Sequence, residues 1–283
     1  MNSLLYLIIS DLHGFFDELM EMLAKTPKNV MVVLLGDIPD YGPKTKQLIE
    51  FLINNPQIKW IMGNHEHIMC NIYQNLVEGK KALYQPHIWI YMNGGAKTLK
   101  SYGLEVQYPD VGVDIANFRN YVKEVSKSRK ATTEFLSLPE VIYSIEQIKQ
   151  LPKDHIDHMS KLPLIFETDE FICSHAPVTQ WNYPGLFDLA KMESNEFLLD
   201  NGCFWARNYP KRQRADKKFQ VFGHMNVKNV LSFTPSNKNG IYTTASLEPK
   251  SYAACFDLAK EGFIVGMEWP SKLLHFIEIK DKI

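Results

Sequence analysis

The chain has 283 residues, with 31 basic and 32 acidic side chains, and 45% of its residues are apolar. A chain of this length can bury a substantial core, and the near-zero net charge excludes a global field that would attract nucleic acid or an anionic membrane. We therefore expect a single domain over residues 1–283, with no nucleic acid binding and no membrane partner.

The cysteines and the first residues of the chain bear on its location. The four cysteines form no CxxC pair, which argues against a zinc ribbon or a disulfide-dense scaffold. The apolar run at residues 4–10 lacks the basic start of a signal peptide and is too short to span a membrane. We therefore expect a reduced, cytoplasmic location.

The first third of the chain repeats one pattern, in which an apolar strand is followed by a polar turn and an amphipathic helix. Strands are predicted at residues 4–10, 30–35 and 58–62, and helices at residues 15–25, 44–54 and 66–77. Open α/β sheets place their sites at strand ends, and polar residues follow all three of these strands. The pattern therefore predicts a site at this edge of a sheet.

The rest of the chain divides into a helical part and a strand-rich part. Several helices are predicted between about residues 109 and 161, broken at Pro139 and Pro152, and we interpret this stretch as a helical insertion. Further strands are predicted at residues 163–167, 170–173, 219–222, 229–233, 251–257, 262–269 and 272–279. They predict a second sheet packed on the first. The expected fold is α/β (α+β), a four-layer αββα sandwich in which helices flank two mixed β-sheets.

The polar residues at the strand ends have the chemistry of metal ligands. Asp11 and His13 are two apart in extended chain, so their side chains point the same way and can share one cation. Asp37 follows the second strand, and its two oxygens can bridge two metals. Asn64 adds a neutral oxygen after the third strand. His175 and His224 repeat the pattern after two later strands.

The repetition of this pattern is more informative than any single residue. Taken alone, an Asp or His at a strand end is more often a helix cap or a hydrogen-bonded core group than a ligand. Here six such positions occur at five strand ends, which predicts a metal site. The chain has no GxxxxGK[ST] loop, and neither Cys173 nor Cys203 begins a C-x5-R sequence. The NTPase and cysteine-phosphatase classes are therefore excluded.

In combination, these motifs resemble those of the calcineurin-like metallophosphoesterases. Within that family they resemble the phosphoprotein phosphatase branch, which includes bacterial and phage phosphatases and diadenosine tetraphosphate hydrolases. The family order is D-x-H-G, G-D-x-x-D-x-G-P, G-N-H-E and two spaced histidines. It appears here as residues 11–14, 36–43 and 63–66, then His175 and His224. Trp89 with residues 93–98, and Trp205-Ala206-Arg207, resemble two further family segments. The resemblance covers roughly residues 4–270.

This resemblance implies a role for each matching residue. The first metal would be bound by Asp11, His13 and Asp37. The second would be bound by Asp37, Asn64, His175 and His224. His65 would be the general acid for the leaving oxygen, oriented by Asp40, and Arg207 would bind phosphate oxygens. A hydroxide that bridges the metals would attack phosphorus in line, with no covalent phosphoenzyme.

One position departs from the family pattern. The chain reads Asp40-Tyr41-Gly42-Pro43 where most phosphoprotein phosphatases read Asp-Arg-Gly-Pro, so one phosphate-binding arginine is replaced by Tyr41. A tyrosine hydroxyl donates one hydrogen bond and carries no charge. The replacement therefore bears on the substrate rather than on the metal ligands, and Tyr41 becomes a candidate substrate-binding residue.

We accordingly predict a metal-dependent phosphomonoesterase, a hydrolase of the protein phosphatase type that acts on phosphorylated Ser/Thr, or Tyr, side chains. One alternative is a hydrolase of dinucleoside polyphosphates or another small phosphodiester. Another is a catalytically weak, phosphatase-like binding module. Oxygen and imidazole ligands suit two divalent metal ions, of which Mn is expected and Fe, Zn or Mg are alternatives. The expected partner is a phosphoprotein or a small phosphorylated substrate.

Overall fold

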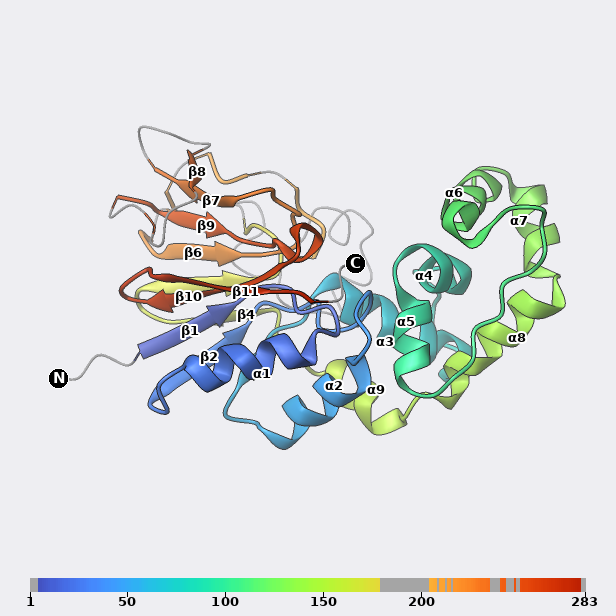
Figure 1. Ribbon diagram of the computed structural model, residues 1–283, viewed down its shortest axis with the longest axis horizontal. Helices are drawn as coiled ribbons and strands as arrows, with labels where there is room; N and C mark the ends of the chain where they lie inside the picture. Colours follow the sequence, from blue (N-terminus) through green and yellow to red (C-terminus); the bar gives the residue numbers. More distant parts are fainter. Residues whose placement is uncertain are drawn as a thin grey trace.

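The computed structural model describes residues 5–178, 204–207, 209–211, 213–214, 216–234, 240–242, 247 and 250–280. In these residues the chain forms two mixed β-sheets that stack on one another, with helices against the first sheet and a lobe of helices at one end (Figure 1). This arrangement confirms the predicted α/β class with two packed sheets.

The first sheet carries the strands predicted in the first third of the chain. Its order is β11 (Leu274–Glu278), β10 (Phe263–Trp269), β1 (Leu5–Ile9), β2 (Val30–Leu34) and β3 (Lys59–Trp60). β1, β2 and β3 are parallel, whereas β10 is antiparallel to both of its neighbours. The carboxyl ends of the three parallel strands lie at one edge, so the turns that follow them meet there.

The second sheet has six strands. Its order is β4 (Ile165–Glu167), β5 (Phe171–Ser174), β6 (Phe219–Phe222), β9 (Ala253–Cys255), β7 (Val230–Phe233) and β8 (Gly240–Tyr242). β5, β6 and β9 are parallel, and the outer strands are antiparallel to their neighbours. The ends of β5 and β6 therefore also lie side by side.

The first sheet is buried on both faces. Leu7 and Ile9 of β1 pack with the helices, whereas Ile8 between them packs with the second sheet. Phe171 of β5 joins the two sheets, because its ring centroid lies 5.0 Å from that of Tyr6 and 5.2 Å from that of Trp269. Burial on both faces explains why β1 is an uninterrupted apolar run.

Helices cover the outer face of the first sheet. α1 (Phe16–Lys25) packs against β10 and β11, and its other neighbour is α2 (Thr45–Asn54). α9 (Lys153–Met159) packs against α2 and α3 (Asn64–Glu78). None of the helices in the described part of the chain combines the length and apolarity that crossing a membrane requires.

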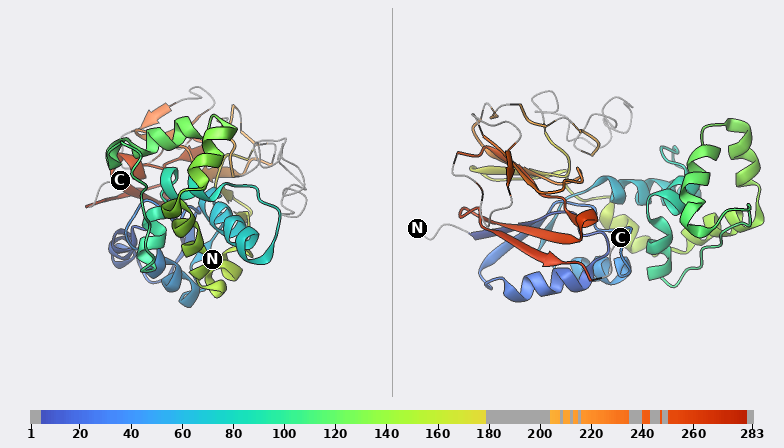
Figure 2. Two further views of the ribbon diagram at one scale, coloured as in Figure 1. Left: turned by 90° about the vertical axis from the view of Figure 1, so that its right-hand side faces the viewer. Right: turned by 45° about the horizontal axis from the view of Figure 1, so that its top comes forward.

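Five further helices form a lobe that projects from the sandwich (Figures 1 and 2). We call α4 to α8 the helical lobe: α4 (Pro86–Met92), α5 (Gly95–Ser101), α6 (Ile115–Val125), α7 (Arg129–Leu136) and α8 (Pro139–Gln147). The lobe has its own aromatic core, in which Phe118 lies 5.3 Å from Tyr91 and 6.3 Å from Phe135 between ring centroids. Two 3-10 turns, η1 (Ile148–Gln150) and η2 (Ala259–Glu261), complete the described elements.

The structure corrects two details of the sequence-based expectation and confirms a third. β10 and β11 belong to the first sheet and not to the second. The helices of the lobe begin before residue 109, with α4 and α5. The helical stretch is divided at Pro139 and Pro152 as predicted, because α7 ends before Pro139, which is the first residue of α8, and Pro152 directly precedes α9. Proline is favoured at this position, where its missing N–H has no helical partner in any case.

Candidate two-metal site

Three loops of the first sheet bring buried polar side chains together. Asp11 follows β1, Asp37 follows β2, and Asn64 is the first residue of α3 after β3. The first two loops are joined directly, since the backbone N–H groups of Leu12 and His13 donate to the Asp37 carbonyl at 3.1 and 2.8 Å. The parallel strands thus place these side chains at one edge of the sheet.

The second sheet contributes two histidines, His175 after β5 and His224 after β6. Asn64 Oδ1 lies 2.8 Å from His175 Nε2 and 2.9 Å from His224 Nδ1. The backbone N–H of His224 also donates to Asp11 Oδ1 at 3.2 Å. The site therefore lies where the ends of the two sheets meet.

Asp37 lies at the centre of this cluster. Its Oδ1 is 3.3 Å from His175 Nε2, and its Oδ2 is 3.7 Å from His65 Nε2 and 4.0 Å from His13 Nε2. Two groups of potential ligands share it: one adds His13 and His65, the other adds His175 and His224. Within each group the ligand atoms lie within 4.8 Å of one another. A carboxylate has two oxygens, so Asp37 can contact a metal ion in each group.

Asp11 lies beside these two groups rather than within them. Its Oδ1 is 3.9 Å from His175 Nδ1, and its carboxylate accepts hydrogen bonds from the Ser10 hydroxyl and the His224 N–H. The structure thus places Asp11 next to the ligand atoms of the second group. Its role as a ligand of the first metal stays a prediction.

The electrostatics of the site fit a bound cation. Burial raises the pKa of the Asp11 carboxyl to about 8, helped by the charge of Asp37, and burial also raises the pKa of Asp37 to about 8. Burial lowers the pKa of His13 and of His224 to about 3, so both imidazoles are neutral. Buried carboxylates without a counter-charge are costly, and neutral imidazole is the form that binds metal.

The donor set also fits divalent metal ions. It consists of carboxylate, amide and imidazole groups, and one imidazole nitrogen, Nε2 of His224, is buried without a hydrogen-bond partner in the described part of the chain. Such a nitrogen is available to a metal. Oxygen and imidazole donors suit Mn, Fe, Zn or Mg.

His65 and Asp40 form a buried pair next to the metal ligands. His65 Nδ1 lies 2.6 Å from Asp40 Oδ2. Asp40 is held in turn by the Thr98 hydroxyl, which donates to its Oδ1 at 2.7 Å, and by Trp89 Nε1–H at 3.0 Å from its Oδ2. Burial lowers the pKa of His65, but Asp37 and then Asp40 raise it to a net value of about 9. The raised pKa favours the protonated imidazole, which is the form that can act as an acid.

Glu66 anchors the loop that carries Asp37, a role that the sequence analysis missed. Its Oε2 accepts the N–H groups of Asp37 at 3.0 Å and Gly63 at 2.9 Å. Its Oε1 accepts the N–H of Ile38 at 2.6 Å and the indole N–H of Trp60 at 3.3 Å. The only signal in the sequence was its place in the motif at residues 63–66.

Asp257 is a second residue that the sequence analysis missed. It is buried after β9, where the N–H of Ala259 donates to its carboxylate at 3.3 Å. Burial raises the pKa of Asp257 well above its ordinary value, and the charge of Asp11 adds to the rise. The signal was available, because a polar residue directly after an apolar strand is the same pattern that identified Asp11 and Asp37.

Of the two predicted substrate-binding residues, Tyr41 contacts two histidines of the site. The ring centroid of Tyr41 lies 5.0 Å from that of His13 and 5.4 Å from that of His65. Burial raises the pKa of the Tyr41 hydroxyl, and Asp40 adds to the rise, so this group is a neutral hydrogen-bond donor. Arg207 is exposed, and its positive charge acts on His224.

Backbone strain is concentrated at the site. Among the non-glycine residues of the described part of the chain, seven have positive φ angles, and five of these belong to the site: His13, Asp37, Asp40, Tyr41 and His224. Such conformations cost roughly 1–3 kcal/mol each and are typical of functional sites. Residue types alone do not predict these backbone conformations.

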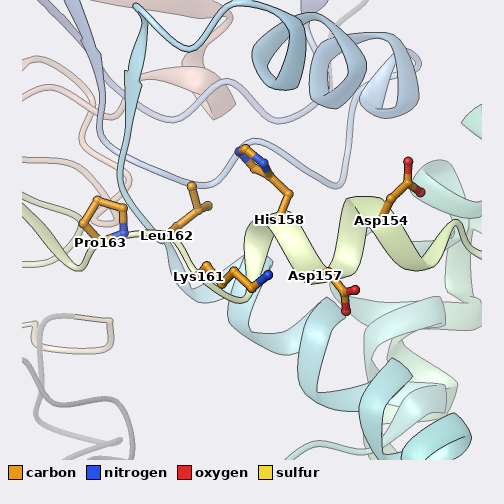
Figure 3. A pocket seen from close by; sticks show the side chains of 6 residues that line it. All are labelled: Asp154, Asp157, His158, Lys161, Leu162 and Pro163. Carbon is orange, nitrogen blue, oxygen red and sulfur yellow. The ribbon is translucent and has the colours of Figure 1, made fainter.

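A surface groove along α9 is separate from this site (Figure 3). It is lined by His158, which stacks on Trp60 with ring centroids 6.0 Å apart, and by Asp157, whose carboxylate pairs with Lys153 at 2.6 Å. None of the predicted site residues lines it. Within the described residues, the two groups that share Asp37 are the only clusters of potential metal ligands.

Comparison with known families agrees with this geometry. Residues 4–236 match the family model of the calcineurin-like phosphoesterases. This chain belongs to that family. The family is one of metal-dependent phosphoesterases, which agrees with the predicted class.

Curated relatives of this phosphoesterase cleave bonds between phosphates, according to their names. A zinc-dependent endopolyphosphatase from Saccharomyces cerevisiae is 31% identical over 75 residues, 25% of this chain and 23% of the relative. A symmetrical bis(5'-nucleosyl)-tetraphosphatase from Buchnera aphidicola subsp. Baizongia pistaciae is 31% identical over 78 residues, 26% of this chain and 28% of the relative. The phosphoesterase thus spans about a quarter of the length of these two relatives.

Longer but weaker matches also exist. A bis(5'-nucleosyl)-tetraphosphatase from Buchnera aphidicola subsp. Schizaphis graminum is 23% identical over 260 residues, 75% of this chain and 94% of the relative. Among solved structures, a metallophosphoesterase from Sphaerobacter thermophilus has a TM-score of 0.48 and 16% identity, with 99% of this chain and 90% of that chain covered.

Proposed function

We propose that this phosphoesterase cleaves its substrate at the Asp37 site with the help of two divalent metal ions. The observation that carries the proposal is that Asp37 lies between His13 on one side and His175 and His224 on the other, while His65, beside the same carboxylate, pairs with Asp40. When bound, the ions would withdraw charge from the phosphoryl oxygens and lower the pKa of an attacking water molecule.

The ligand assignment follows the sequence motifs. Asp11, His13 and Asp37 would hold one ion, and Asp37, Asn64, His175 and His224 would hold the other. Support comes from the two hydrogen-bond-length contacts of Asn64 Oδ1 with the histidine nitrogens, at 2.8 and 2.9 Å. Mn is the expected metal, with Fe, Zn or Mg as alternatives.

His65 is proposed as the general acid. Water attacks phosphorus in line, the bond between phosphorus and the leaving oxygen breaks, and His65 gives its proton to that oxygen. Asp40 keeps the imidazole protonated and oriented, since its carboxylate lies 2.6 Å from Nδ1. Arg207 binds phosphate oxygens through its forked donors from the His224 side of the site.

Two substrate classes are compatible with this chemistry. The family motifs support phosphorylated Ser/Thr, or Tyr, side chains, which are phosphomonoesters. The names of the curated relatives support dinucleoside polyphosphates or another chain of phosphates, and one tetraphosphatase matches over 94% of its own length. We favour the second class, because the relative that is matched over most of its length is a tetraphosphatase.

A metal panel crossed with a substrate panel tests the proposal. The protein is stripped with a chelator and reloaded with Mn, Fe, Zn or Mg, and then assayed on diadenosine tetraphosphate, tripolyphosphate and phosphoserine peptides. We expect metal-dependent turnover, with diadenosine tetraphosphate or tripolyphosphate preferred. Turnover of the peptides alone would support the protein phosphatase class instead. Equal rates in the wild type, Asp11→Asn and His65→Asn would support the binding module.

A further inference from the structure

An aromatic pair borders the site beside His224. The indole ring of Trp205 is half-buried and lies 5.8 Å from the His224 imidazole between ring centroids, with the two ring planes perpendicular. Tyr84, which is also half-buried, lies 6.3 Å from Trp205 between ring centroids. Trp205 therefore presents part of an aromatic surface directly beside a proposed metal ligand, and Tyr84 extends that surface.

Hydrogen bonds fix the orientation of this aromatic surface. Trp205 Nε1–H donates to the Tyr84 hydroxyl at 3.3 Å. The same hydroxyl lies 3.0 Å from Nδ1 of His67, which belongs to α3, the helix that begins with Asn64. The N–H group of a tryptophan usually finds such a partner when the ring is buried. The one polar atom of the indole is therefore satisfied within the protein, and the apolar surface of the ring is the part that a ligand can contact.

The residue before Trp205 holds this part of the chain against α3. Phe204 is fully buried, and its ring stacks on that of His67, with centroids 4.9 Å apart and an angle of 18° between the planes. Trp205 is thus tied to α3 in two ways, through the Tyr84 hydroxyl and through Phe204. An aromatic ring that is already held in place loses little conformational freedom when a ligand packs on it, so stacking on Trp205 costs little entropy.

We propose that Trp205 is a specificity-determining residue that stacks on the base of a nucleotide, and that Tyr84 positions it. The inference rests on the proposed function and narrows its substrate class to phosphate chains that carry a nucleoside. The contact with His224 places Trp205 within reach of a group attached to a phosphate at the site. Every nucleobase has a planar face that stacks on aromatic side chains. An inorganic phosphate chain has no such face and gains nothing from Trp205.

Binding to the manganese-loaded protein tests this inference without catalysis. Adenosine 5'-(α,β-methylene)diphosphate carries a base, whereas methylenediphosphonate has the same P–C–P group without a nucleoside. We expect the wild type to bind the nucleotide more tightly in calorimetry. Trp205→Ala should weaken nucleotide binding roughly fivefold to a hundredfold, the range for one stacked base, and leave methylenediphosphonate binding unchanged. Equal losses for the two ligands would indicate a purely structural role for Trp205 and would overturn the proposal.

Three further variants separate stacking from positioning. Trp205→Phe keeps an aromatic ring and should recover part of the loss. Tyr84→Phe removes the acceptor of the indole N–H and should weaken nucleotide binding alone, by a smaller factor than Trp205→Ala. Tyr209→Ala is the matched control, because it removes a nearby ring that is 38% exposed and packs on Phe233 of β7, and it should bind like the wild type. A loss in Tyr209→Ala as large as that in Trp205→Ala would contradict the role of Trp205.

Kinetics give a second readout. Trp205→Ala should lower kcat/KM for diadenosine tetraphosphate roughly fivefold to a hundredfold and leave tripolyphosphate unchanged. A phosphotyrosine peptide should also be unaffected, because its ring is attached directly to the phosphate without a ribose between them. Equal losses on tripolyphosphate, or a loss confined to the phosphotyrosine peptide, would overturn the inference. If the wild type cleaved none of the three substrates, the proposed function would fail, and the difference in binding would still decide the role of Trp205.

Discussion

Buried ionisable groups a few ångströms apart have widely separated pKa values in this site. The pKa of His65 is raised to about 9, whereas that of His13 is lowered to about 3. Both rings are buried, so the difference comes from their neighbours. Burial lowers the pKa of both rings. At His65 the charges of Asp37 and Asp40 outweigh burial, whereas at His13 the charge of His65 adds to it. One histidine is thus prepared to give a proton, and the other to bind a metal.

Asp40 is expected to control the protonation of His65. Asp40→Asn removes a negative charge 2.6 Å from His65 Nδ1, so the pKa of His65 should fall. The decline of kcat at high pH should then move to lower pH. His65→Asn should lower kcat by roughly 10²- to 10⁴-fold. Trp89→Phe is the matched control, because it removes one hydrogen bond to Asp40 and leaves its charge. A pH–rate profile of Asp40→Asn identical to the wild type would contradict this role.

The metal-free protein should lose stability as the pH rises from about 6.5 to about 8. Asp11 and Asp37 have folded-state pKa values of about 8, and His65 of about 9, all above their unfolded values. In each case the folded state holds its proton more tightly, so stability falls as the pH approaches the folded pKa. His13 and His224, with a pKa of about 3, have the opposite effect, but only below about pH 6.5.

Urea unfolding at several pH values, in the presence of a chelator, measures this loss in the free energy of unfolding. Added Mn²⁺ should abolish it, because a bound cation replaces the protons on Asp11 and Asp37. Stability of the metal-free protein that is flat or rising over this pH range would contradict the expectation.

At the level of elements, the first turn of α3 carries three adjacent residues with three different tasks. Asn64 contacts both histidines of the second sheet, His65 pairs with Asp40, and Glu66 holds the loop of Asp37. The start of one helix therefore fixes the relative positions of both halves of the site.

Glu66→Ala should destabilise the protein and weaken metal binding together. It leaves four buried donors unpaired, at a cost of about 1–3 kcal/mol each, so we expect a loss of at least about 3 kcal/mol in the free energy of unfolding. Glu78→Ala, at the other end of α3, is the control, and loss of its surface ion pairs should cost less than about 1 kcal/mol. Equal losses in the two variants would exclude the anchoring role.

Elements with a strong local pattern could be predicted from the sequence, and those that depend on distant partners could not. The helices at residues 16–25 and 45–54 match the prediction closely, because their apolar spacing is visible locally. The pairing of Tyr6 with Trp269, which places β10 in the first sheet, joins opposite ends of the chain. In the site, most residues at strand ends were identified, whereas Glu66 acts through tertiary contacts. Asp257 was missed although it follows a strand.

At the level of the whole molecule, the site depends on the stacking of the two sheets. The first sheet supplies Asp11, Asp37 and Asn64, and the second supplies His175 and His224. Phe171 lies between the sheets, away from the site, and packs on Tyr6 and Trp269. Metal affinity should therefore depend on how firmly the sheets are held together.

Phe171→Ala tests this dependence. Removal of a fully buried aromatic ring typically costs about 3–5 kcal/mol, and the midpoint of urea unfolding should fall accordingly. Saturating Mn²⁺ should recover part of the loss, because ligands from both sheets are needed to bind it. Phe276→Ala is the control, since that ring is 41% exposed. If Phe171→Ala binds Mn²⁺ as tightly as the wild type under conditions where both are fully folded, the site does not depend on tight packing between the two sheets.

The hydrogen bond between the His224 N–H and Asp11 spans 213 positions of the chain. During synthesis on the ribosome, the loops that carry Asp11, Asp37 and Asn64 emerge long before β6 and His224. A nascent chain stalled before residue 219 would hold part of the ligand set, and its metal capture should be weak. Metal loading of this phosphoesterase is thus expected to follow translation rather than accompany it.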